Sequence, residues 1–148
     1  MTKTLHPVAG STALLTIMIF WVSTVSSEVS GNADWVMAVK TAIPWGFIVL
    51  VPALMATGIS GMHLGAGRRG ALLARKRWRM QVIAANGLLI LVPSALFLAM
   101  RAQAGQFDAA FFAVQGVELA AGAVNIALLG LNMADGLRMT GRLRRRAA

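Results

Sequence analysis

The sequence predicts an all-α fold, a transmembrane antiparallel four-helix bundle, and three observations support this class. The chain of 148 residues is 57% apolar and 13% charged, whereas soluble proteins average about 45–50% apolar and about 25% charged residues. It offers four apolar stretches of about 20 residues, the length that crosses a hydrocarbon core of about 30 Å. Most of its positive charge lies at one end of these stretches. We therefore expect a single integral membrane domain over residues 1–148.

The predicted spans are about Val8–Ser26, Thr41–Met62, Met80–Met100 and Phe107–Met133. The first link is polar and acidic, the second is strongly basic, the third is short, and a basic tail over residues 138–148 follows the last span. Short links of this kind are typical of an up-down-up-down bundle. Pro52 and Pro93 fall inside the second and third spans, and we expect kinks there because proline removes a helix hydrogen bond.

The distribution of Lys and Arg predicts the orientation. Of the 14 basic residues, Lys3 precedes the first span, six lie between the second and third spans, and five follow the fourth. Only Lys40 and Arg101 lie in the other two links. Positive charge in short links marks the cytoplasmic side, so we expect both termini inside, in the inner membrane of a bacterium. The net charge of +9 then faces anionic lipid headgroups, and nucleic acid is not an expected partner.

Small residues four positions apart recur in the second and fourth spans, where they place backbone surfaces on one helix face. The pairs are Gly61 and Gly65, Ala56 and Ser60, Gly116 and Ala120, and Ala123 and Ala127. Because membrane helices approach each other most closely at small residues, these two spans are predicted to pack tightly.

Glu118 is the most unusual residue of the predicted spans. It lies about 15 Å beyond Asp108 along a helix, close to the midplane. A carboxylate at this depth is costly unless it is protonated, paired or facing a wet cavity. Further polar or small residues follow on the same face at steps of three, four or seven: Gln115, Gly122, Asn125 and Asn132. Candidate partners on neighbouring spans are Thr57, Asn86 and Ser94.

Two interpretations of this polar intramembrane site, formed by Gln115, Glu118 and Asn125, stay open. It is either a proton, ion or ligand site at the midplane, or a set of hydrogen bonds that holds the helices together.

The two histidines form a second candidate site. His6 precedes the first span and His63 follows the second, so both are expected at the cytoplasmic face. Two imidazoles on facing helices commonly ligate haem b, and Arg68 and Arg69 are placed to pair with the haem propionates. Alternatively, both histidines are interfacial residues with a polar tip in the headgroup zone. The chain has no cysteine, which excludes thiolate metal sites, and haem iron is the one metal considered.

With histidines at span ends and a basic inner link, the chain resembles the small bacterial four-helix b-type membrane cytochromes of the cytochrome b561 kind, and uncharacterised bacterial inner-membrane proteins of this size. The resemblance implies an electron-transfer protein with one haem b near the cytoplasmic face, held by His6 and His63. A two-haem relay is not expected, because the fourth span has no histidine.

The implied partners are the lipid bilayer and a quinone or redox partner protein. The alternative function is a small transport or accessory subunit of a membrane complex with a midplane polar site around Glu118. No hydrolase or transferase signature is present, and homo-oligomerisation is left open.

Overall fold

The computed structural model describes residues 2–67 and 70–139, and this part of the chain is helical apart from its links. The elements are α1 (Thr2–Ser30), α2 (Ala33–Leu64), α3 (Ala71–Asn86), the π-helical turn η1 (Gly87–Leu91), α4 (Val92–Gln103) and α5 (Ala109–Met139). Because α3, η1 and α4 follow one another without a break, they form one rod. The described chain therefore has four helices long and apolar enough to cross a membrane, which confirms the predicted all-helical class.

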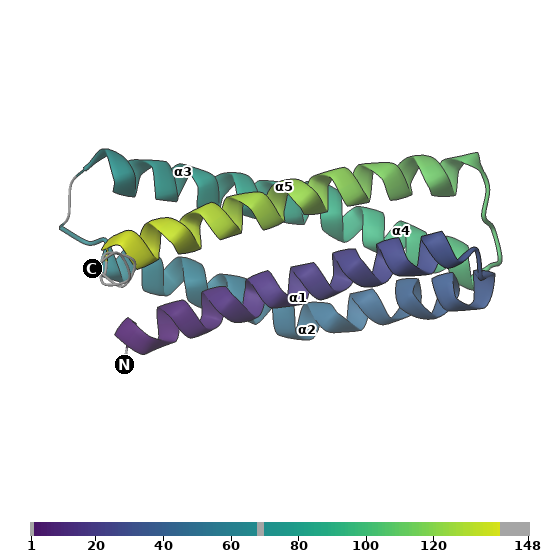
Figure 1. The fold of residues 1–148 in the computed structure, drawn as a ribbon, viewed down its shortest axis with the longest axis horizontal. Coiled ribbons are helices and arrows are strands. Elements are labelled where there is room, and N and C mark those ends of the chain that lie inside the picture. Colours follow the sequence, from purple (N-terminus) through teal and green to yellow (C-terminus); the bar gives the residue numbers. More distant parts are fainter. Residues whose placement is uncertain (1, 68–69, 140–148) are drawn as a thin grey trace, which may run out of the picture.

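The four rods lie side by side along the long axis of the molecule, and the start of α1 and the end of α5 lie at the same end (Figure 1). We call this the basic end, because the link between α2 and α3 and the cluster Arg75–Arg79 also lie there. The opposite end is called the turn end. It holds the α1–α2 turn at Gly31–Asn32 and the α4–α5 turn at residues 104–108.

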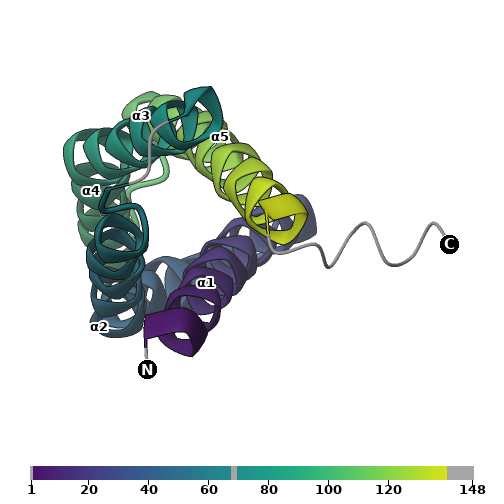
Figure 2. The ribbon, with the colours of Figure 1, turned by 90° about the vertical axis from the view of Figure 1, so that its left-hand side faces the viewer.

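Seen along the bundle, the rods occupy the corners of a square (Figure 2). Helix α1 lies between α2 and α5, and the rod of α3 and α4 occupies the corner opposite α1. Helices α2 and α5 are therefore diagonal to each other. Helix α1 lies between them, and of the small residues predicted at close contacts Gly61 faces His6 of α1, whereas Gly65 faces Leu73 and Arg77 of α3.

The helices are longer than the predicted spans, and α2 begins at Ala33, well before the predicted start at Thr41. The Asn32 side-chain oxygen accepts hydrogen bonds from the backbone N–H groups of Asp34 and Trp35, at 3.0 and 3.2 Å. Such a cap begins a helix, and Gly31 before it supplies the left-handed turn with a φ of 65°. Lys40, which the sequence placed in a link, therefore lies inside α2. That expectation was wrong because it followed the lysine's charge and overlooked the cap.

The third rod is irregular directly before Pro93, where a kink was expected. The π-helical turn Gly87–Leu91 ends with the Val92 N–H bonded to the Gly87 carbonyl. A π-turn of this kind relieves the clash that a proline ring makes in a regular helix. Helix α2, by contrast, is continuous through Pro44 and Pro52.

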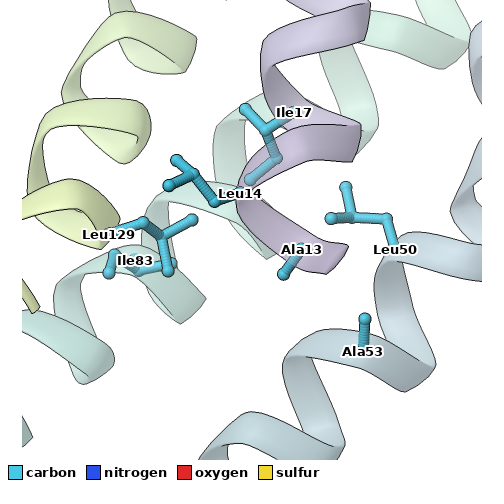
Figure 3. Packing of buried hydrophobic residues seen from close by; sticks show 7 residues of the cluster. All are labelled: Ala13, Leu14, Ile17, Leu50, Ala53, Ile83 and Leu129. Atoms are coloured by element: carbon cyan, nitrogen blue, oxygen red, sulfur yellow. The ribbon is translucent and has the colours of Figure 1, made fainter. Parts of the chain in front are cut away.

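The apolar core is narrow and is drawn from every rod. Figure 3 shows its central cluster, in which α1 contributes three side chains and the other rods one or two each: Ala13, Leu14, Ile17, Leu50, Ala53, Ile83 and Leu129. Many large apolar side chains point outward instead, among them Trp45 at 72% exposure and Leu89 at 71%. An apolar exterior of this extent is compatible with contact to lipid and is unusual for a protein in water.

Glycines allow α1 to approach both of its neighbours. A Cβ atom at Gly46 of α2 would overlap the ring of Phe20. A Cβ at Gly122 of α5 would lie 3.1 Å from Cδ1 of Trp21, and one at Gly61 would lie 3.2 Å from Cε1 of His6. Gly61 is one of the small residues expected at a close contact, whereas Gly116 has no side chain near it within the described residues.

Candidate intramembrane polar site

An ion pair joins the two diagonal helices inside the bundle. Lys40 Nζ of α2 lies 2.5 Å from Glu118 Oε2 of α5, and the two side chains are 1% and 11% exposed. Lys40 also donates a hydrogen bond to Thr24 Oγ1 of α1, at 3.4 Å. The four-carbon stem of lysine supplies the reach across the bundle. Glu118 therefore pairs with Lys40, and not with the partners that the sequence suggested.

The pair lies in the half of the bundle nearer to the turn end. Helix α5 has 31 residues, so Val124 is its centre and Glu118 lies six positions before it. At about 1.5 Å per residue, this offset is about 9 Å. The sequence placed Glu118 near the midplane by counting inward from Asp108, whereas the centre of α5, which continues to Met139, lies further along the chain.

A small, partly open cavity adjoins Glu118. Its volume is about 50 Å³, and its wall includes the aromatic side chains of Phe20, Trp21 and Phe47 and the polar side chains of Thr24 and Glu118. One water needs about 10–15 Å³ measured in this way, so the cavity has room for a few waters. The indole N–H of Trp21 is not available to hydrogen-bond a molecule in the cavity, since it donates to the Leu119 carbonyl at 3.0 Å. Glu118 thus borders a partly open space that is otherwise mainly apolar.

Two side chains near the pair carry buried polar atoms that lack hydrogen-bond partners within the described residues. The amide of Gln115, which is 4% exposed, has neither its nitrogen nor its oxygen bonded. Oε1 of Glu28 is likewise buried and unbonded. Glu28 of α1 lies within electrostatic reach of both Lys40 and Glu118. Since buried polar groups are nearly always satisfied in native proteins, these orphaned atoms require an explanation.

Asn125, the third residue of the predicted site, belongs to a separate bridge. Its Oδ1 accepts a hydrogen bond from Asn86 Nδ2 at 2.8 Å, and Asn86 also donates to the Ala121 carbonyl at 2.9 Å. The Asn125 amide donates to the Ile83 carbonyl at 3.4 Å. This bridge joins the rod to α5 directly before the π-turn. Along α5, Asn125 follows Glu118 of the ion pair by seven positions, about two helical turns.

A third polar bridge lies at the basic end, and sequence reasoning missed it. Arg79 Nη1 is 2.8 Å from Asp135 Oδ2, and Arg75 Nη2 is 3.7 Å from the same oxygen. Asp135 is 5% exposed. It was overlooked because the predicted span ended before it, and Arg79 was counted only as a charge that orients the protein. The signal was present in the polar stripe, which continues toward Asp135 through Asn132.

The two histidines lie near the same part of α2, since His63 belongs to α2 and His6 of α1 contacts Ser60 of α2. Nδ1 of His6 lies 3.0 Å from Ser60 Oγ, and Nδ1 of the exposed His63 lies 3.1 Å from the Ile59 carbonyl. Arg68 and Arg69, expected to pair with propionates, lie outside the described residues. The described residues include no cluster of three or more His, Cys, Asp or Glu side chains suited to a metal ion. A bis-histidine haem needs only two ligands, so that hypothesis stays a prediction.

No protein-family model, curated protein or solved structure matches this chain. A function for it therefore depends on the contacts described above.

Proposed function

We propose that this chain is a small transport or accessory subunit of the bacterial inner membrane, with the Lys40–Glu118 pair as its functional centre. Its four helices form an antiparallel bundle with both termini in the cytoplasm. The observation that carries the proposal is the ion pair itself, buried between diagonal helices and bordering a cavity. Ionisable residues inside membrane spans are costly, and they commonly mark ion, proton or substrate pathways.

A purely structural role explains this pair poorly. Buried ion pairs contribute little to stability, because desolvation offsets most of the attraction between the charges. Other hydrogen bonds already fasten α5 to its neighbours, from Trp21 of α1 and from Asn86 of the rod. The pair is, however, suited to switching. Protonation of Glu118 neutralises the carboxylate and weakens its hold on Lys40, which couples proton binding to the contact between α2 and α5.

The position of Lys40 inside α2 strengthens the proposed orientation. Because Lys40 lies inside α2 and not in the first link, Arg101 is the basic residue at the turn end. Its side chain pairs with Asp108 at 3.3 Å. The basic end retains the cluster from Arg75 to Arg79. Because positive charge marks the cytoplasmic side, the turn end is proposed to face outward.

The test is proton flux in vesicles that contain the purified protein and a trapped pH-sensitive dye, with an imposed pH gradient. We expect the wild type to admit protons faster than protein-free vesicles and Glu118→Gln to fall to the protein-free level. Asp108→Asn, which makes the same chemical change at the turn end, is the matched control and is expected to keep the wild-type flux. A flux that is unchanged in Glu118→Gln would remove the pair from the pathway.

A haem-binding electron-transfer protein is the second candidate, favoured by the histidine geometry. Nδ1 of His6 contacts Ser60 and Nδ1 of His63 contacts the Ile59 carbonyl, and a hydrogen bond at one ring nitrogen is what commonly orients the other toward a metal. One haem b near the cytoplasmic face would then exchange electrons with a quinone or a redox partner protein. The reduced-minus-oxidised visible spectrum of the purified protein tests this, since a b-type α-band should disappear in His6→Ala and in His63→Ala. A colourless wild type, purified after haem supplementation, contradicts it.

A further inference from the structure

The charges around Lys40 do not balance. Two carboxylates, Glu28 of α1 and Glu118 of α5, lie within electrostatic reach of this one ammonium group. The other charged groups of the turn end do not correct the difference, because Arg101 is engaged with Asp108 and Asp34 lies exposed in the first turn of α2. With all three groups ionised, the cluster has one uncompensated negative charge. Burial of such a charge is costly unless a partner neutralises it.

Gln115 is a second unusual feature beside this cluster, independent of the charges. Its carboxamide is almost fully buried, and both of its polar atoms lack a partner within the described residues. Gln115 precedes Glu118 by three positions, so the two side chains are neighbours on the same buried face of α5. A buried amide left without hydrogen bonds is destabilising, and native proteins normally supply a ligand or water there.

The free atoms form a set of oxygen acceptors of suitable chemistry. Oε1 of Glu28 and Oε1 of Gln115 are buried and unbonded within the described residues, and Glu118 adds the oxygen that does not contact Lys40. Carboxylate and amide oxygens suit hard cations, and the cluster offers neither thiolate nor imidazole. A single positive charge balances the cluster, whereas a divalent ion would leave it positive.

We propose that Glu28, Gln115 and Glu118 form, around Lys40, a binding site for one monovalent cation, either a proton or a sodium ion. The cation occupies the place between the two carboxylates that Lys40 does not fill, and the Gln115 amide completes its surroundings. The inference concerns binding alone, so it holds whether or not the protein moves an ion across the membrane.

The first experiment measures the thermal unfolding midpoint of the purified protein at constant ionic strength, as sodium chloride replaces choline chloride. For a sodium site, we expect the midpoint to rise saturably with sodium and the effect to disappear in Glu28→Gln, which removes the excess charge. In Gln115→Leu the apparent affinity should fall about tenfold, the equivalent of one lost hydrogen bond to a charged group. Asp34→Asn and Gln103→Leu, the same changes at exposed positions, should behave as wild type.

The second experiment records the infrared spectrum at neutral pH and distinguishes the proton. If sodium has no effect, we expect a protonated carboxyl band in the wild type and in Asp34→Asn that is absent from Glu28→Gln or Glu118→Gln. The proposal is overturned if the wild type shows neither a saturable sodium effect nor this band. It is also overturned if either signal survives unchanged in Glu28→Gln and Glu118→Gln. Should Gln115→Leu fail to fold, the Glu28 and Glu118 variants decide the outcome.

Discussion

Lys40 is the residue whose structural role differs most from what its sequence position indicates. A lysine between a polar segment and an apolar run is normally a residue of the membrane boundary. Here the Asn32 cap starts α2 at Ala33, seven positions before Lys40. Lys40 therefore lies inside the helix and is one of the most buried side chains, at 1% exposure. Glu118 could be identified from sequence because a lone carboxylate inside an apolar span is conspicuous. Its partner could not, because pairing between diagonal helices depends on the rotation of each helix.

Removal of one member of the pair should be more damaging than removal of both. We expect Lys40→Met to lower the free energy of unfolding by about 3–5 kcal/mol, because it leaves the Glu118 carboxylate buried without its partner. The double variant Lys40→Met with Glu118→Met should recover most of that loss. Denaturation in mixed micelles measures both values, and additive losses in the double variant would show that the two residues act independently.

At the scale of the helix, α5 is the element that carries the polar chemistry of the bundle. From Phe111 to Asn132 its inward positions follow alternating steps of four and three, as in a coiled-coil seam: Phe111, Gln115, Glu118, Gly122, Asn125, Leu129 and Asn132. The stripe was predictable from this spacing alone. What each position bonds to was not, because Glu118, Asn125 and Asn132 have partners on α2 and on the rod of α3 and α4.

The histidine site was less predictable than the stripe. Sequence placed His6 and His63 at the same membrane face, and the structure puts His6 against Ser60, one turn from His63. The directions of the two rings follow from a contact between helices for His6 and from a bond within α2 for His63, and no periodicity specifies either.

The contact between α1 and α2 gives a test of packing within one helix. Gly46→Ala should destabilise the protein by about 1–3 kcal/mol, because the new methyl group would overlap the Phe20 ring. Gly58→Ala is the matched control on the same helix, since no side chain lies near Gly58 in the described structure and alanine favours helix. Unfolding in mixed micelles compares them. Equal stability of the two variants would mean that Phe20 does not pack on Gly46.

For the molecule as a whole, the basic and turn ends define the proposed orientation in the membrane. The absence of cysteine from the chain allows single cysteines to be introduced without interference. In intact cells, a membrane-impermeant maleimide should label Ser30→Cys and Gln106→Cys at the turn end. It should label Ala66→Cys only after the membrane is permeabilised. The reverse pattern would invert the orientation and place the ion pair nearer to the cytoplasm.

The measurement that tests the central claim most directly is proton flux in vesicles containing the double variant Lys40→Met with Glu118→Met. This variant removes the pair without leaving a lone buried charge, so the bundle is expected to fold with near wild-type stability. If the pair is the functional centre, flux falls to the level of protein-free vesicles although the protein is intact. A folded double variant that admits protons at the wild-type rate would contradict the account and reduce the Lys40–Glu118 pair to a packing contact.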